Sequence, residues 1–328
     1  MSLVENYKNI RKSIVAFVCK YKPKNHPEEP DPAFPPIIGT GFVVDADGLI
    51  ATNHHVIRAF EKVWKPKDAK EEDWGVIGIL FHLTPEGMMQ FPLEVIGAGV
   101  VGGFDPGKNY YGPVKPDIGI VHVKARELPC VTVEEKPILV EGMEIATAGF
   151  PMGEDTLMAP GWLHQITPTL QRGIISAILP FECEEYHALA INIMTQGGAS
   201  GSPVFFTDSG NVIGILYAGL KEPCLTTYSL PSKIRKAIEK IEPSLHSHLF
   251  QAPTNISYVV PSRFIPKSIE QVKSDPSFSV PQDAQTIEEM KKTMPRKSSL
   301  EAIERDRKNM SANSSNKPSV KEFKINIV

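Results

Sequence analysis

Short runs of apolar residues, each bounded by glycine, proline or aspartate, dominate the chain from residue 13 to about residue 220. They are rich in β-branched side chains and of the length that is typical of strands. Because helices do not alternate regularly with these runs, the pattern predicts an all-β sandwich or barrel rather than a parallel sheet. Representative runs are residues 41–44, 75–81, 117–123, 144–150, 173–179 and 212–217.

Two segments have a helical pattern instead. Residues 4–12 precede the first predicted strand, Ser13–Cys19. Residues 232–241 place apolar side chains at helical spacing inside an insertion that covers residues 221–253. A proline-rich stretch from Pro23 to Pro36 fits neither helix nor central strand, because each proline lacks an N–H donor and has a fixed φ. We interpret it as an extended loop.

Composition and charge exclude several classes of protein. Apolar residues make up 41% of the 328 residues, which is enough for a sizeable core. The formal net charge of −3 gives no general reason to expect nucleic acid or a membrane surface as a partner. No apolar run approaches the roughly 18 residues of a membrane-spanning helix. Residues 1–12 lack the apolar segment of a signal peptide, so we expect a cytoplasmic protein.

The composition changes near the C-terminal end of the chain. Residues 266–328 are rich in Ser, Asn and Lys and poor in aromatic residues. Such a segment cannot form a core of its own, so we expect a largely disordered polar tail. Within it, residues 298–309 could form a short charged helix.

One segment has the composition of a nucleophile turn. Residues 197–204 read Gly-Gly-Ala-Ser-Gly-Ser-Pro-Val. Small neighbours allow a sharp turn that exposes the Ser200 hydroxyl and directs backbone N–H groups toward one point. An ordinary glycine-serine turn between strands is the alternative interpretation of this segment alone.

Two further segments supply a base and an acid. Residues 39–56 predict a strand, an Asp-Gly turn and a second strand that ends at Thr-Asn-His-His-Val. Asp117 then precedes the buried strand Ile-Gly-Ile-Val. The order His, Asp, Ser along the chain is that of the chymotrypsin triad.

Together with the segments 142–153, 173–176 and 256–262, these motifs make the chain resemble trypsin-like serine peptidases, in particular the Deg-type (high-temperature-requirement) branch. The resemblance implies two antiparallel six-stranded β-barrels of the chymotrypsin type, about residues 13–125 and 138–262, within a peptidase domain of residues 1–265. Because the residues after 266 are few and mostly polar, we expect no PDZ domain of the kind that most Deg-type proteases have.

The resemblance also implies roles for individual residues. His55 would be the general base, Asp117 would orient it and Ser200 would be the nucleophile. His54 is the rival base, but the family's catalytic histidine directly precedes the valine of the motif. The oxyanion hole would be formed by backbone N–H groups, those of Gly198 and Ser200 with Ala199 as a possible third.

This sequence departs from the family pattern at two positions of the turn. Ser202 replaces a glycine. Ala199 stands where secreted trypsin-like enzymes have an aspartate that receives a newly cleaved N-terminus, so that form of zymogen activation has no acceptor here.

By the same resemblance, Met194 would lie at the base of the specificity pocket. No acidic residue is found there, which favours an uncharged apolar side chain before the cut. One wall of the pocket would be the strand formed by Leu216, Tyr217, Ala218 and Gly219.

We therefore expect a serine endopeptidase that acts on peptides or proteins through an acyl-enzyme. A catalytically restrained trypsin-like fold that serves as a binding or scaffold module is the alternative, although all three triad residues are present. We expect no cofactor, nucleic acid or membrane partner. We also expect no metal, since the spacing of the available ligands fits no zinc motif; these are Cys183, His187, Cys224, His246 and His248.

The last residues, 321–328, leave two readings open. They alternate polar and apolar side chains and could add as a strand beside Leu216–Gly219, with Val328 in the pocket. The alternative is a tail without effect on the active site.

Overall fold

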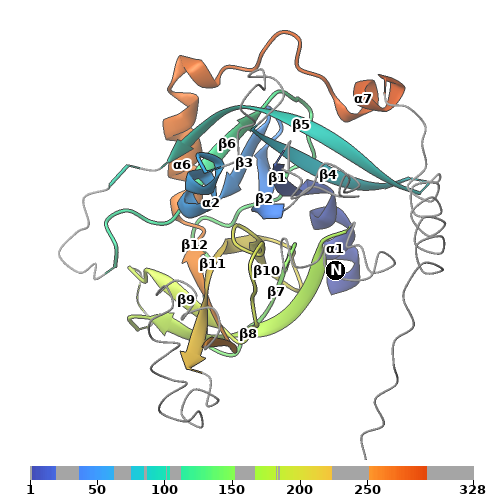
Figure 1. Cartoon of the computed structure of the whole chain (residues 1–328). Coiled ribbons are helices and arrows are strands. Elements are labelled where there is room, and N and C mark those ends of the chain that lie inside the picture. The colour runs from blue at the N-terminus through green and yellow to red at the C-terminus, as the bar shows by residue number, and fades with distance from the viewer. Residues whose placement is uncertain are drawn as a thin grey trace, which may run out of the picture.

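The computed structural model describes residues 2–19, 37–62, 75–84, 87–100, 102–103, 112–151, 167–181, 183, 185–223 and 251–293. It contains two closed barrels of six antiparallel strands each, which lie one above the other in Figure 1. The two barrels expected from the resemblance are therefore confirmed. The predicted helices 232–241 and 298–309 and the terminal segment 321–328 lie outside the described residues.

The first barrel closes in the order β1-β2-β3-β6-β5-β4. Alternate side chains of its strands face inward and form an apolar core that includes Phe17, Phe91 and Leu93, all fully buried. Its strands are β1 (Ile14–Cys19), β2 (Ile37–Asp45), β3 (Leu49–Thr52), β4 (Val76–Thr84), β5 (Gly87–Val100) and β6 (Gly119–Val123).

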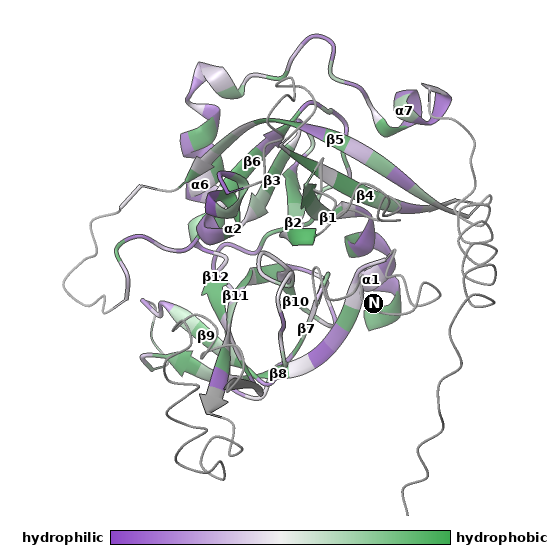
Figure 2. Cartoon of the chain, in the orientation of Figure 1, coloured by the Kyte–Doolittle hydropathy of each residue, from purple (hydrophilic) through white to green (hydrophobic). Residues whose placement is uncertain are grey.

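The second barrel closes in the order β10-β11-β12-β9-β8-β7. A separate core that includes Ile145, Leu189 and Val259 fills it. Figure 2 shows the corresponding hydrophobic colouring along the strands of both barrels. Its strands are β7 (Glu144–Gly149), β8 (Thr169–Leu179), β9 (Ala188–Ile191), β10 (Pro203–Phe206), β11 (Val212–Pro223) and β12 (Gln251–Pro261).

A third apolar cluster takes residues from both barrels and fixes one against the other. Phe81 of β4 and Phe150, which follows β7, have ring centroids 5.3 Å apart. Both side chains are at most 1% exposed. Close packing of this kind leaves the barrels little freedom to slide, which matters for a site that is formed between them.

The N-terminal helix connects the two barrels. The predicted helix is present as α1 (Leu3–Ile10), followed by the short helix η1 (Arg11–Ser13). Ser2 and Glu5 form a reciprocal capping box at its start. The helix leads directly into β1 of the first barrel, yet its side chains bond to the second: Asn6 Nδ2 donates to the Thr207 carbonyl at 3.0 Å and the Tyr7 hydroxyl to the Pro168 carbonyl at 2.6 Å.

Residues 266–293 are a structured part of the molecule rather than the beginning of the polar tail expected from residue 266. They include most of α6 (Phe264–Lys273), the short helix η5 (Pro276–Phe278) and α7 (Ile287–Thr293), which pass over the first barrel in Figure 1. Few of their residues are apolar, but those few are buried: Ala284, Ile287 and Met290 are each at most 7% exposed. The sparse apolar positions made the segment look like a tail.

Phe278 anchors this segment to the outer face of β5. Its ring lies over Gly97 and Gly99 and stacks on His122 of β6, with ring centroids 5.7 Å apart. Further along, Arg126 Nε donates to the Ala284 carbonyl at 2.9 Å, and its guanidinium forms an ion pair with Glu289 at 3.0 Å. Among the residues that the structure describes, no helix has both the length and the apolar character needed to cross a bilayer.

Candidate active site

His55 and Asp117 come together because β3 and β6 are neighbours in the first barrel. Thr52, the last residue of β3, pairs with Gly119, the first residue of β6. His55 lies in the first turn of α2 (His54–Phe60), just after β3, and Asp117 lies just before β6. Asp117 Oδ2 lies 2.6 Å from His55 Nδ1, and Asp117 Oδ1 accepts a hydrogen bond from the His55 backbone N–H at 3.0 Å.

Neighbouring residues hold this pair in place. The Asn53 side chain is fully buried, and its Nδ2 donates to the backbone carbonyl of Asp117 at 2.9 Å. The rival histidine is engaged elsewhere, since His54 Nε2 accepts a hydrogen bond from Arg58 Nε at 3.2 Å. The structure thus brings His55, rather than His54, to the carboxylate.

The environment keeps Asp117 ionised. Burial by itself raises the pKa of Asp117, but two hydrogen bonds from His55 and the charges of His55 and His54 together outweigh it. The net result is a pKa below the ordinary value for aspartate. An ionised carboxylate that accepts from Nδ1 leaves Nε2 of a neutral His55 as a proton acceptor.

The turn that carries Ser200 is folded tightly by two glycines. Gly198 and Gly201 have φ values of +87° and +89°, in the left-handed region that favours glycine. A Cβ atom on Gly201 would lie only 1.9 Å from the carbonyl oxygen of Thr40, so the turn rests directly on β2 of the first barrel. Any side chain at residue 201 would push the two barrels apart.

Backbone contacts hold the Ser200 turn against the first barrel, next to the residue that follows His55. The Thr40 N–H donates to the Ser200 carbonyl at 2.8 Å. Next to it, a Cβ atom on Gly39 would lie 2.7 Å from Cγ1 of Val56, the residue after His55, and 3.4 Å from the same Ser200 carbonyl. Gly39 is therefore in contact with both sides of the site. The Ser200 hydroxyl forms no hydrogen bond with a described residue.

Two backbone N–H groups of the turn are available to a ligand. Within the described part of the chain, the N–H groups of Gly198 and Ser200 have no acceptor. The Ala199 N–H, by contrast, donates to the Gln196 carbonyl at 3.2 Å. Because the Ala199 N–H already has an acceptor within the turn, it is not free to bind a ligand as the N–H groups of Gly198 and Ser200 are.

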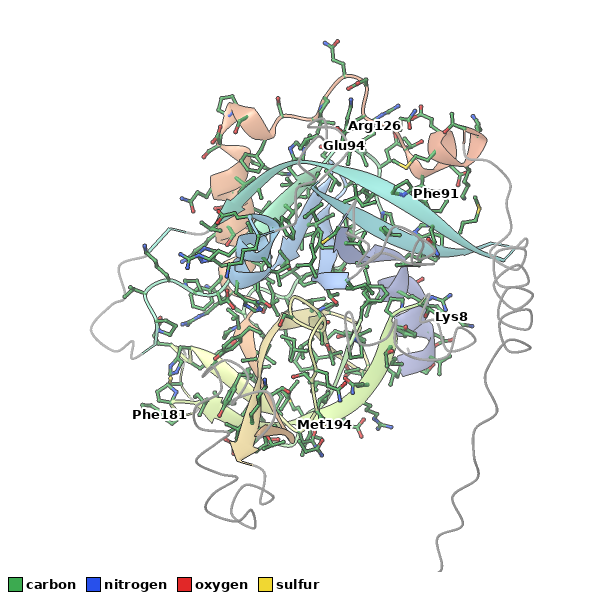
Figure 3. The ribbon with its side chains drawn as sticks, in the orientation of Figure 1. Lys8, Phe91, Glu94, Arg126, Phe181 and Met194 are labelled. Atoms are coloured by element: carbon green, nitrogen blue, oxygen red, sulfur yellow. The ribbon has the colours of Figure 1, made fainter. Side chains whose placement is uncertain are left out.

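The expected specificity residues lie in the second barrel. Met194 is 42% exposed and lies in the lower part of that barrel in Figure 3. The residue that faces the predicted wall is its neighbour, Thr195: a Cβ atom on Gly219 would lie 2.7 Å from Thr195 Oγ1. Thr195 Oγ1 lies 2.8 Å from Ser257 Oγ, which donates to the Ile193 carbonyl at 2.6 Å.

Sequence analysis missed Thr195 and Ser257. The only signal was that Thr195 directly follows the residue assigned to the base of the pocket. Tyr217, on the same wall, is partly buried, and burial raises the pKa of its hydroxyl, with smaller contributions from Tyr258 and Asp117. Within the described ranges, no three His, Cys, Asp or Glu side chains gather so that they could hold a metal ion. Cys224, His246 and His248 lie outside these ranges.

Comparisons with known proteins find similar sequences and structures. A family model described as a trypsin-like peptidase domain matches residues 39–215. A probable periplasmic serine endoprotease, DegP-like, from Halomonas elongata is 27% identical over 178 residues, which are 54% of this chain and 28% of the relative. A DegP-like protein of the same description from Chlamydia muridarum is 29% identical over 199 residues, 58% of this chain and 30% of the relative.

Among solved structures, the HtrA-type protease AlgW with tripeptide aligns with a TM-score of 0.46 and 14% identity, covering 83% of this chain and 64% of that one. The chain spans 28% and 30% of the length of these two DegP-like relatives.

Proposed function

The chain belongs to the family of trypsin-like peptidase domains, and from that premise we propose that it is a serine endopeptidase with His55, Asp117 and Ser200 as its catalytic residues. The observation that supports the proposal is the pair of contacts from one Asp117 carboxylate to His55, at 2.6 and 3.0 Å, together with the bond from the Thr40 N–H of the same barrel to the Ser200 carbonyl at 2.8 Å.

The proposed reaction proceeds through an acyl-enzyme. Ser200 Oγ attacks the carbonyl carbon of the scissile peptide bond while His55 Nε2 takes its proton. The ionised Asp117 stabilises the imidazolium that results. The N–H groups of Gly198 and Ser200 bind the oxyanion of the tetrahedral intermediate. His55 then protonates the leaving amine, and a water molecule activated by the same imidazole hydrolyses the ester.

We propose that the residue before the cut is uncharged and apolar. The site next to Gly219 contains the hydroxyls of Thr195 and Ser257. These hydroxyls bond to each other, and that of Ser257 donates to the Ile193 carbonyl. A charged side chain would find no partner among these groups, and desolvating it without one is unfavourable. Met194 and the strand Leu216–Gly219 remain the other proposed parts of the pocket.

A fluorophosphonate probe tests the proposal, because it reacts only with an activated serine. We expect the wild-type protein to be labelled on Ser200, and Ser200→Ala to abolish labelling. Ser176→Ala, which removes an exposed serine of β8, is the matched control and should be labelled like the wild type. A wild-type protein that is folded yet unlabelled would favour the alternative, a restrained fold that acts as a binding module. The cytoplasmic localisation stays a prediction.

A further inference from the structure

Thr40 stands out because its fully buried side chain contacts the nucleophile turn from the opposite barrel. It lies on β2 of the first barrel and is 0% exposed, and its hydroxyl bonds, among the described residues, only to groups of the second barrel. We propose that Thr40 is a positioning residue whose hydroxyl holds the oxyanion hole in its working conformation. The inference rests on the proposed peptidase function and extends it to a residue that does not contact the substrate.

The hydrogen bonds of the Thr40 hydroxyl leave no choice of direction. Its Oγ1 lies 3.1 Å from the Phe150 backbone N–H, which can only donate, and 2.7 Å from the Gly198 carbonyl, which can only accept. The hydroxyl has one proton, and one of its two lone pairs accepts from the Phe150 N–H. The proton must therefore point at the Gly198 carbonyl.

This contact fixes the peptide unit between Gly198 and Ala199 at both ends. Its carbonyl is held by Thr40 Oγ1, and its N–H donates to the Gln196 carbonyl at 3.2 Å. Because the peptide unit is planar, neither end can rotate alone. The Gly198 N–H is joined to this unit through only two rotatable bonds, one of which has a φ of +87°, so fixing the unit restricts the direction of that N–H.

The next peptide unit, between Ala199 and Ser200, is held by a second hydroxyl. The Ala199 carbonyl accepts from Ser202 Oγ at 2.6 Å and from the Ser202 N–H at 3.1 Å. In a trans peptide the N–H points opposite to the carbonyl. The Ser200 N–H therefore points away from Ser202 and out of the turn. The Ala199 carbonyl thus accepts two hydrogen bonds, whereas the Gly198 carbonyl accepts one, from Thr40 Oγ1.

Residue 199 cannot provide such an anchor itself. Its side chain is a methyl group, 4% exposed, that packs in the core of the second barrel. No carboxylate is present there to hold the turn through an ion pair. Instead, the Thr40 hydroxyl of the first barrel holds the turn by donating a hydrogen bond to the Gly198 carbonyl.

Three variants test the inference. Thr40→Val keeps the shape of the side chain and removes the hydroxyl, whereas Thr40→Ser keeps the hydroxyl. Thr147→Val is the matched control: Thr147 is 2% exposed, and its Oγ1 donates to the Pro203 carbonyl at 2.9 Å within the second barrel. Each variant is assayed on a chromogenic peptide, at a temperature at which circular dichroism shows it folded.

We expect Thr40→Val to lower kcat by about 10- to 100-fold, which is less than the loss on deleting an oxyanion donor outright. KM should change by less than about twofold, because ground-state binding is untouched. A peptidyl trifluoromethyl ketone, whose hemiketal oxyanion occupies the same hole, should lose affinity in parallel with kcat. Thr40→Ser should retain most of kcat, and Thr147→Val should keep both constants near those of the wild type. Ser202→Ala should lose less than Thr40→Val, because the Ser202 N–H remains.

Each contrary result has a separate meaning. If the wild type is active and labelled at Ser200 but Thr40→Val keeps its kcat and its affinity for the ketone, the positioning role is wrong and the peptidase function stands. If Thr147→Val loses kcat as strongly as Thr40→Val, the effect is one of general packing, and the positioning role is equally wrong. A wild type that is inert on all substrates and probes overturns the proposed function and this inference with it.

Discussion

Asp117 contacts His55 twice, through Oδ1 to the backbone N–H and through Oδ2 to Nδ1 of the ring. The first contact fixes where the histidine backbone lies, and the second fixes which ring nitrogen carries the proton. A carboxylate can do both because it only accepts hydrogen bonds, whereas an amide in its place would present a donor to one of these two positions.

Asp117→Asn should therefore lower kcat by about 10⁴-fold, because it favours the wrong tautomer of His55 without removing the base. Steady-state kinetics on a peptide substrate measure the loss, and circular dichroism checks that the variant is folded. His54→Ala is the control: its ring is paired with Arg58 rather than with Asp117, so its kcat should stay close to that of the wild type. Equal losses in both variants would contradict the assignment of His55.

Substituting Thr195 should change the preferred substrate. Its hydroxyl occupies the space next to Gly219, so Thr195→Ala enlarges the proposed pocket. We expect the ratio of kcat/KM for large over small apolar residues before the cut to rise by about 10-fold, the size of effect that one buried group has on discrimination. A peptide library reports both profiles. A wild-type profile dominated by Lys or Arg would refute the proposed pocket altogether.

Phe278 should contribute to the stability of the first barrel. Phe278→Ala removes the ring that covers Gly97, Gly99 and His122. Because this ring is only partly buried, we expect a loss of about 1–3 kcal/mol in the free energy of unfolding, less than the roughly 3–5 kcal/mol of a fully buried phenylalanine. Urea denaturation measures it, with Phe278→Leu as the conservative control. An unchanged free energy of unfolding would mean that residues 276–278 do not hold to the barrel in solution.

His122 should make the stability of the protein depend on pH. Burial lowers the pKa of His122, and the opposing effect of Asp47 is smaller. The unfolded chain then binds a proton near the ordinary pKa of 6.5, where the folded protein does not. The free energy of unfolding should thus fall as the pH drops through 6.5 toward the lower folded pKa. Below that value no further loss arises from this group.

His122→Phe should remove this component. The measurement is urea denaturation of wild type and variant at several pH values between about 7.5 and 5, a range in which histidine is the side chain that titrates. Because His82 and His187 also have lowered pKa values, the difference between the two proteins is the informative quantity. A difference that stays constant with pH would contradict the prediction.

The sequence predicted those parts of the molecule that are local in the chain. Short apolar runs rich in β-branched residues marked the strands, and the short motifs around residues 55, 117 and 200 marked the candidate site, because each needs particular residues next to one another. Thr40 could not be recognised in the same way. It is one more β-branched residue of a strand, and its partner Gly198 lies 158 positions further along the chain.

Thr195 and Ser257 illustrate the same limit, since the two hydroxyls meet across 62 positions of sequence. The segment 266–293 was misjudged for a different reason. Within it, the helices bury only a few residues, namely Ser268, Ile287 and Met290, and leave the others half-buried or exposed. A few buried residues hardly change the average composition of a segment, although they are enough to hold it on a barrel.

The hydrogen bonds of α1 have a consequence for the order in which the protein forms during synthesis. Asn6 and Tyr7 bond to residues that are 201 and 161 positions later in the chain. Helix α1 is made before both barrels and therefore has to wait for its partners until most of the second barrel has been made. Since such distant contacts form late, this helix is among the last of the described elements to reach its final place. Because α1 leads into the first barrel and bonds to the second, it can dock only when both barrels are in contact.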